Sequence, residues 1–353
     1  MDQVLQQFRD RIMSATRSGI ALRIRGNGTK DWYGQELNGE LLDTTAYSGI
    51  ISYDPTELVV TARAGTNLRE IGKALAEKKQ MLAFEPPRFD GLATVGGIVA
   101  SGLSGPRRQA VGSVRDFVLG TVLMDGKGET LHFGGQVMKN VAGYDVSRLL
   151  TGSLGTLGLI LEVSLKVLPR PFAQHSLQFV MSEQDALHQL NIWGGQPLPL
   201  SASCWVNGNL YVRLSGAQAA VDAAIAKMGG TDLPDAENFW DGVREQTHTF
   251  FSAPQQALWR LSLPTVAPSL ALPGEQMIEW GGALRWLKTT ADAETIRSVA
   301  ANAGGHATLY KGGDKSVGVF QPLAPAVARI HRNLKQAFDP AGIFNPRRMY
   351  TDF

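Results

Sequence analysis

Glycine in apolar sequence is the feature of this chain that most limits how it can fold. Between Gly91 and Ile160, fifteen of seventy residues are glycine, and they stand between short apolar runs such as Ala93–Val95. Glycine costs backbone entropy and weakens strands and helices, so this density indicates that the backbone passes close to another group. Because successive N–H groups in glycine turns bind anions without lysine or arginine, we expect that group to be a large anionic cofactor.

Length and composition indicate a globular protein with two lobes. The chain has 353 residues, more than one hydrophobic core usually supports, with 44% hydrophobic and 19% charged residues. A formal net charge of +2 without a basic run argues against nucleic-acid binding. Charged residues at helical spacing in the N-terminal segment are not expected of a signal peptide, and no apolar run reaches the ~18 residues of a membrane span. We therefore expect a cytoplasmic protein that reaches a membrane only through partners.

Hydrophobic periodicity predicts an α+β fold and a domain boundary. Apolar residues alternate strictly with Glu162, Ser164 and Lys166 between residues 160 and 168, which predicts a strand with one buried and one wet face. Two prolines then end the strand near residue 170. Beyond them, hairpins around Asn207–Gly208 and Gly281–Gly282 alternate with helices, as in an α+β lobe built on a largely antiparallel sheet. We expect a first lobe at 1–170, a cap at 171–330, and a C-terminal segment at 331–353 that returns to the first lobe.

The common nucleotide-binding fingerprints are absent. No Gly-x-Gly-x-x-Gly follows a strand and opens a helix, and Gly313–Ser316 lacks the glycine directly before lysine that a Walker A loop needs. The glycines therefore either serve turns and bulges alone or belong to another kind of anion site.

Four motifs in order resemble the FAD-binding domain of the vanillyl-alcohol oxidase and p-cresol methylhydroxylase (PCMH) superfamily. They are Arg25–Thr29 (Arg-Gly-Asn-Gly-Thr), Thr94–Gly97 followed by Ser101, Gly102 and Gly105, Gly143–Leu149, and Gly152–Ile160. The tail Phe338–Pro346 is similar to the C-terminal signature of the 2-hydroxy-acid dehydrogenase branch. The likeness covers the whole chain and is strongest to the E-subunit family of bacterial glycolate oxidases. It implies a two-lobed PCMH-type FAD fold with an α+β cap.

The resemblance also implies which residues hold FAD. The first two motifs would surround the pyrophosphate, and Gly112–Asp116 would line the adenosine side. Gly152–Ile160 would run beside the ribityl chain and the flavin ring. Thr29 stands where some members carry a histidine that is joined to the flavin, so non-covalent FAD is expected. The cofactor-binding residues implied are Arg25, Gly26, Asn27, Gly28, Thr29, Thr94, Val95, Gly96, Gly97, Ser101, Gly102, Gly105, Arg107, Gly112, Val114, Asp116, Gly152, Gly155, Thr156, Gly158, Ile160 and Asn345. Lys139 and Asn140 stand where the family keeps polar residues near the flavin.

The family further implies an FAD-dependent oxidoreductase that acts on CH–OH groups. This chain would be the FAD-binding subunit of a glycolate oxidase or dehydrogenase complex, in which glycolate or a similar 2-hydroxy acid is oxidised to the 2-oxo acid. The partners implied are a paralogous FAD subunit and an iron–sulfur subunit, which would hold the complex at the inner membrane. Two alternatives stay open: a self-sufficient FAD oxidase or dehydrogenase of another alcohol or hydroxy acid, and a non-catalytic structural subunit that binds FAD.

Catalytic candidates are few. The His-x-Gly-Asp-Gly-Asn-x-His motif of the catalytic members has no match, and the six histidines show no pair at ligand spacing, so no metal site is expected. The single Cys204 stands in an apolar strand and is expected to be a buried thiol. Arg260 is the candidate for binding a substrate carboxylate, since guanidinium geometry suits one, and Arg285 is a weaker candidate of the same kind.

Overall fold

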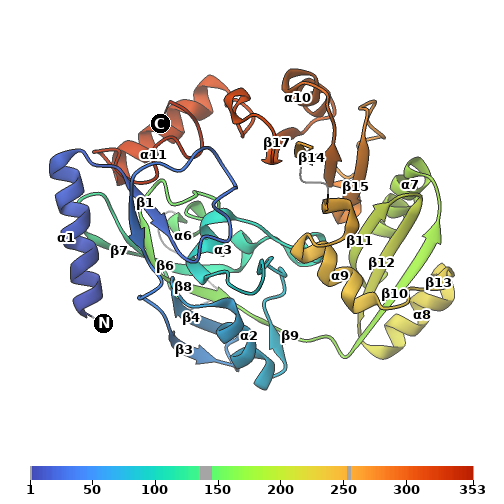
Figure 1. The fold of residues 1–353 in the computed structure, drawn as a ribbon. Helices are drawn as coiled ribbons and strands as arrows, with labels where there is room; N and C mark the ends of the chain where they lie inside the picture. Colours follow the sequence, from blue (N-terminus) through green and yellow to red (C-terminus); the bar gives the residue numbers. More distant parts are fainter. Residues whose placement is uncertain (1, 136–144, 253–255, 353) are drawn as a thin grey trace. The chain divides into compact units, whose positions relative to one another are not determined.

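The computed structural model describes residues 2–135, 145–252 and 256–352. They form two compact units (Figure 1). Unit 1 comprises residues 1–103, 113–169 and 322–353, and unit 2 comprises residues 104–112 and 170–321. The sequence therefore passes from unit 1 to unit 2 between Pro169 and Arg170, but the short segment 104–112 also belongs to unit 2. Both units mix helices with antiparallel sheets, so the α+β prediction is confirmed.

Unit 1 contains a five-stranded sheet, a parallel strand pair and several helices. The sheet order is β3-β4-β8-β6-β7, with antiparallel neighbours, and β1 pairs with β2 in parallel. The elements are α1 (Asp2–Ser18), β1 (Leu22–Arg25), β2 (Glu40–Asp43), β3 (Ile50–Asp54), β4 (Val59–Arg63), α2 (Leu68–Glu77), β5 (Gln80–Met81), α3 (Val95–Ser101), α5 (Val114–Phe117), β6 (Val118–Met124), β7 (Thr130–Gly134), α6 (Val146–Leu149), β8 (Leu159–Lys166), β9 (Leu168–Pro169) and α11 (Pro325–Phe338).

The core beside β1 joins the two ends of the chain. Phe8 and Ile12 share one face of α1 at helical spacing and pack against Leu22 of β1 and Phe344 of the tail. The tail runs beside β1, because Leu22 N–H donates to Ile343 O at 2.7 Å and Asn345 N–H donates to Leu22 O at 2.9 Å. The N-terminal helix and the C-terminal tail thus build one core.

The prediction that one face of β8 is exposed to solvent is wrong in part. Ser164 is buried, and its hydroxyl lies 2.9 Å from Thr61 Oγ1 on β4. Glu162 is half-buried and accepts a hydrogen bond from Tyr47 Oη at 3.0 Å. Glu162 and Ser164 are therefore at least partly covered, and both are paired, because β8 lies in the middle of the sheet between β4 and β6.

Unit 2 is built on an eight-stranded sheet of order β13-β10-β12-β11-β15-β16-β14-β17, with antiparallel neighbours throughout. The predicted antiparallel sheet is confirmed. The elements are α4 (Arg108–Val111), β10 (Ala173–Val180), α7 (Glu183–Gly194), β11 (Leu200–Val206), β12 (Asn209–Gly216), α8 (Gln218–Met228), β13 (Thr231–Asp232), α9 (Ala236–Glu245), the 3-10 turn η1 (Thr249–Phe251), β14 (Leu258–Ser262), β15 (Glu275–Glu279), η2 (Trp280–Gly282), β16 (Leu284–Lys288), α10 (Ala293–Asn302), β17 (His306–Lys311) and η3 (Lys315–Val317).

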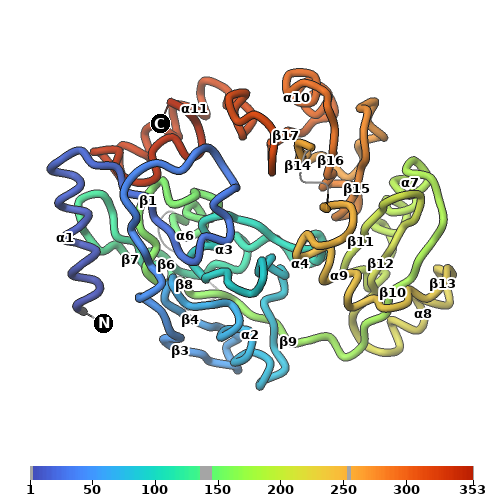
Figure 2. Tube along the Cα trace, viewed as in Figure 1, coloured from blue at the N-terminus to red at the C-terminus, as the bar shows by residue number. Residues whose placement is uncertain are grey.

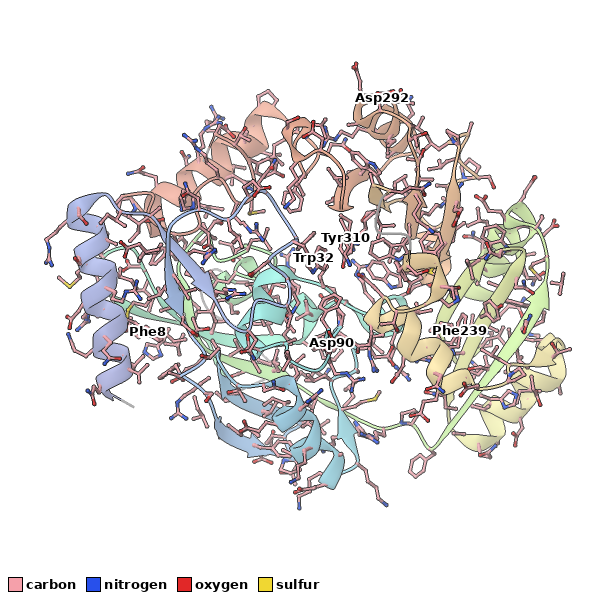
Figure 3. All side chains as sticks on the ribbon, in the orientation of Figure 1. Phe8, Trp32, Asp90, Phe239, Asp292 and Tyr310 are labelled. Atoms are coloured by element: carbon pink, nitrogen blue, oxygen red, sulfur yellow. The ribbon has the colours of Figure 1, made fainter. Side chains whose placement is uncertain are left out.

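The two faces of this sheet differ in chemistry. Helices α7, α8 and α10 cover one face of the sheet (Figure 2). This face is apolar, and on it Trp259 and Leu261 of β14 pack against Ile296 of α10. The opposite face carries polar and aromatic side chains and is partly covered by aromatic contacts, including Tyr211 with Phe239 and Trp286 with Tyr310 (Figure 3). Strand alternation places Arg260 on this second face.

Candidate functional site

Helix α3 is the centre of the candidate cofactor site in unit 1. Thr94 begins the helix, because its extended backbone lets Oγ1 accept the N–H of Gly97 at 3.3 Å. Gly102 ends it in the left-handed conformation, with a φ of 67°. The apolar residues Val95, Ile98 and Val99 are buried, so the packing of these side chains fixes the position of the short helix.

The first glycine turn, residues 26–29, meets the N-terminal end of α3. A Cβ added at Gly26 would lie 2.6 Å from Thr94 Oγ1, so only glycine fits there. Asn27 Nδ2 donates to Leu92 O at 2.8 Å, and Trp32 Nε1 donates to Thr29 O at 3.1 Å, which fix both sides of the turn. Within the described ranges, the backbone N–H groups of residues 27–29 have no protein acceptor. Three successive free N–H groups in a turn are suited to an anion.

The second glycine turn, residues 151–156, meets the C-terminal end of the same helix. Gly152 N–H donates to Val99 O at 2.9 Å, and Leu154 N–H donates to Ala100 O at 2.8 Å. A Cβ at Gly102 would lie 3.1 Å from Gly152 Cα, so the two backbones nearly touch. Helix α3 therefore joins the two turns that the family resemblance assigns to different parts of FAD.

The residues present fit a bound cofactor at the second turn. Apart from its two chain neighbours, no atom of the described residues lies within 4 Å of a Cβ added at Gly152, so these residues leave space beside its backbone. The hydroxyls of Thr151 and Ser153, on either side of Gly152, are buried and have no hydrogen-bond partner in the described chain. Buried hydroxyls nearly always find a partner, so a ligand or water is expected there.

Protein contacts explain most of the other glycines. A Cβ at Gly96 would lie 2.7 Å from Ala64 Cβ, one at Gly155 would lie 2.7 Å from Asn345 Nδ2, and one at Gly158 would lie 2.9 Å from Met124 O. At Gly28 it would meet the guanidinium of Arg25, which itself pairs with Asp31 at 2.8 Å. The glycine density does mark close approach, but at these positions the neighbour is the protein itself.

Asn345 and Arg348 form hydrogen bonds to the segments that build the site. Asn345 Oδ1 accepts the N–H of Ile24 at 2.9 Å, and its Nδ2 donates to Leu154 O at 2.6 Å, which ties β1 to the second turn. Arg348 donates to Asp31 O at 2.8 Å and also to Gln35 O. Burial lowers the pKa of Arg348 to about 10, against the opposing effect of Asp31 and Glu36.

Lys335 and Asp339 complete this support, and the sequence prediction missed both, as it missed Arg348. Lys335 Nζ donates to Thr156 O at 2.8 Å, to Phe344 O at 2.8 Å and to Asp339 Oδ2 at 2.7 Å. The sequence signal that could have indicated this ion pair is a lysine and an aspartate four residues apart at the end of an amphipathic helix.

The other implied cofactor residues lie outside α3 and the two glycine turns. Val114 and Asp116 belong to α5, where Asp116 accepts the N–H of Ser113 at 2.8 Å, and Ile160 lies in β8 opposite Leu123. Gly105, Arg107 and Gly112 belong to unit 2. A cofactor contact by these residues stays a prediction. Lys139, Asn140, Gly143 and Tyr144 lie outside the described residues.

Arg107 is hydrogen-bonded inside unit 2. Its Nη2 lies 3.3 Å from Gln174 Oε1 on β10 and 3.3 Å from Ser215 Oγ on β12, and the residue is buried.

The two arginine candidates of unit 2 differ. Arg260 is half-buried, and its guanidinium lies 5.3 Å from the centre of the Trp280 ring. Arg285 is fully buried and donates to Pro268 O and Gly282 O, so it is a structural residue, and its expected role as a carboxylate ligand is wrong. Cys204 is buried, as predicted, and burial raises the pKa of its thiol.

The part of the chain that the structure describes holds no group of three or more His, Cys, Asp or Glu side chains that could bind a metal ion. Among its helices, none combines the length and apolar composition that crossing a membrane requires.

Comparison with known proteins places the chain in a family. The family described as "FAD binding domain" matches residues 5–134. The chain is 50% identical to glycolate oxidase subunit GlcE of Escherichia coli (strain K12) over 347 residues, which are 98% of this chain and 97% of that protein. It is 31% identical to glycolate oxidase subunit GlcD of Bacillus subtilis (strain 168) over 140 residues, 40% of this chain and 30% of that protein.

A solved structure of alkyldihydroxyacetonephosphate synthase has the same fold. Its TM-score is 0.64 at 14% identity, and the match covers 97% of this chain and 75% of that chain. Together with the 50% identity along nearly the full length, these findings support the resemblance described from the motifs. The chain belongs to the glycolate oxidase subunit GlcE family of PCMH-type flavoproteins, and it carries an FAD-binding domain.

Proposed function

We propose that this chain is the FAD-binding subunit of a complex that oxidises glycolate, or a similar 2-hydroxy acid, to the 2-oxo acid. The observation that carries the proposal is the 50% identity to glycolate oxidase subunit GlcE over 98% of the chain. The free N–H groups at residues 27–29 lie inside the matched FAD-binding domain and support it.

FAD, when bound, supplies a hydride acceptor, and the chain supplies binding and orientation. The N–H groups of residues 27–29 would bind a pyrophosphate oxygen, and the hydroxyls of Thr151 and Ser153 would hydrogen-bond the cofactor beside Gly152. Helix α3, through its contacts with both turns, keeps these donors at a fixed separation.

Arg260 is the residue we assign to the substrate carboxylate. Its guanidinium has no hydrogen-bond acceptor and no ion-pair partner among the described residues, although the side chain is half-buried. Arginine binds carboxylates through two parallel N–H donors, so a 2-hydroxy acid would satisfy this group.

Partner subunits complete the proposed complex. A single cysteine cannot supply the ligands of an iron–sulfur cluster, so electrons would leave through an iron–sulfur partner. A paralogous FAD subunit is the second proposed partner, by analogy with the similar GlcD protein. The proposed location is the cytoplasmic side of the inner membrane, with attachment through these partners.

Anaerobic stopped-flow measurement tests the proposal. Glycolate and D-lactate are mixed with the flavin-loaded chain alone and with the chain assembled with its co-purified partners, and absorbance near 450 nm is followed. The proposal predicts rapid bleaching by glycolate in the assembly and slow or no bleaching of the isolated chain. Rapid bleaching of the isolated chain would favour the self-sufficient enzyme, and an assembly that glycolate never bleaches would contradict the proposal and favour a structural FAD subunit.

A further inference from the structure

Trp280 has a constrained conformation in the loop between β15 and β16. Its φ is 53°, in the left-handed region that bulky residues rarely adopt, and Gly281 and Gly282 follow with φ values of 63° and 101°. Trp280 is buried, and its Nε1 donates to Gly105 O at 3.1 Å. Gly281 N–H donates to Ser203 Oγ at 2.9 Å. Backbone strain of this kind persists only where neighbours enforce it, and such positions cluster at functional sites.

Two guanidinium groups lie over the Trp280 ring. The Arg108 carbon Cζ lies 4.4 Å from the ring centre, and that of Arg260 lies 5.3 Å from it. Arg108 is fixed by α4, which packs so closely on this loop that a Cβ at Gly281 would lie 2.3 Å from Gln109 Nε2. Both arginines and Trp280 belong to unit 2, so this cluster is formed within one compact unit.

The groups around Arg260 leave it without a counter-ion. Trp286 is its neighbour across β16, and the Nε1 of Trp286 donates to Glu279 Oε1 at 2.7 Å. On β17, Thr308 lies opposite Arg260 and His306 lies opposite Ser262, so His306 and Arg260 share one face of the sheet. Arg260 has no acceptor in the described chain, and the Trp280 ring is the contact that orients it.

We infer that Trp280 is a positioning residue, which holds Arg260 in the orientation that binds the substrate carboxylate. An aromatic face attracts a cation that lies over it, and its contact limits the rotation of the long arginine side chain. This inference rests on the proposed function, because it takes the 2-hydroxy acid as the ligand of Arg260.

The test compares Trp280→Leu, which removes the ring, with Trp280→Phe, which keeps one, in the assembled flavin-loaded complex. The readouts are KM and kcat for glycolate and the inhibition constant of acetate, which has a carboxylate but no hydroxyl. We expect Trp280→Leu to raise KM and the acetate constant together by about tenfold with kcat within threefold, and Trp280→Phe to change either by less than threefold. Flavin content and melting temperature show whether each variant is folded.

A double-mutant cycle with Arg260→Gln separates positioning from a general structural role. If Trp280 acts through Arg260, then Trp280→Leu adds no further rise in KM when Arg260 is already glutamine. Additive effects, or an unchanged acetate constant in folded Trp280→Leu, would overturn the inference. Failure of the proposed function would give a different result, because the wild-type complex would then not oxidise glycolate. An Arg260→Gln variant with unchanged KM would overturn the carboxylate assignment, and the inference with it.

Discussion

Replacing Lys335 by methionine is expected to destabilise unit 1 strongly while leaving unit 2 unchanged. The Nζ group of Lys335 donates three hydrogen bonds of 2.7–2.8 Å, one of them to Asp339, whose side chain has no exposed surface. Burial lowers the pKa of Lys335, and the adjacent Asp339 carboxylate opposes this shift, so the two charges depend on each other.

The magnitude follows from the ion that the substitution leaves behind. Methionine fills similar space, but the Asp339 carboxylate then remains buried with only the N–H groups of Ile343 and Phe344 as donors. Removing one partner of a buried ion pair costs about 3–5 kcal/mol. Domains are stable by roughly 5–15 kcal/mol, so the free energy of unfolding of unit 1 should fall by about a fifth or more.

Urea unfolding of the FAD-free chain measures this change. Trp32 is in unit 1 and the other six tryptophans are in unit 2, so tryptophan fluorescence reports mainly unit 2, and circular dichroism reports both units. Lys73→Met, at an exposed position of α2, is the matched control. The double variant Lys335→Met/Asp339→Asn should recover part of the loss, because it leaves no buried charge. A loss below about 1 kcal/mol for Lys335→Met would refute the reasoning.

Three further predictions concern the cofactor site and pH. Gly97→Asp should leave α3 folded, since an acidic residue suits the first turn of a helix, but repel the pyrophosphate, so that purified protein carries at least tenfold less FAD than Gly97→Asn; equal flavin content would show that the site is misplaced. Asn345→Ala should cost about 1–3 kcal/mol and speed FAD release, because Ile24 N–H and Leu154 O lose their partner; an unchanged melting temperature and release rate would contradict this. Burial lowers the pKa of His248, whose Nδ1 accepts the N–H of Phe250. The neutral form of this histidine therefore stabilises the fold fully above the unfolded pKa near 6.5, and this stabilisation is lost as pH falls through the lower folded pKa. The melting temperature of unit 2 should therefore fall between pH 7.5 and 5, less so in His248→Asn, and identical pH profiles would exclude this histidine as a cause.

Local sequence signals predicted local structure well. Asn207–Gly208 forms the two-residue hairpin turn expected of it, with φ values of 49° and 76°, because Asn and Gly adopt left-handed φ more readily than most residues. Hairpin connections likewise correctly indicated the antiparallel sheet of unit 2.

Tertiary contacts account for what the sequence could not show. Whether a glycine faces a cofactor or another strand depends on neighbours distant in sequence, as at Gly26 against Thr94 and Gly155 against Asn345. Arg285 has the same alternating context as Arg260, yet it lies fully buried among backbone carbonyls. The support of the site by Lys335 and Arg348 required the return of the tail to β1 and the following loop.

Hydrogen–deuterium exchange of the FAD-free and FAD-loaded chain tests the central claim most directly, namely that helix α3 and its two glycine turns hold the cofactor. The account predicts that FAD slows exchange most in peptides that contain residues 26–30, 94–102 and 151–156, because these amides bind the cofactor or lie beside it. Slowing confined to other peptides, with these three segments unchanged, would contradict it.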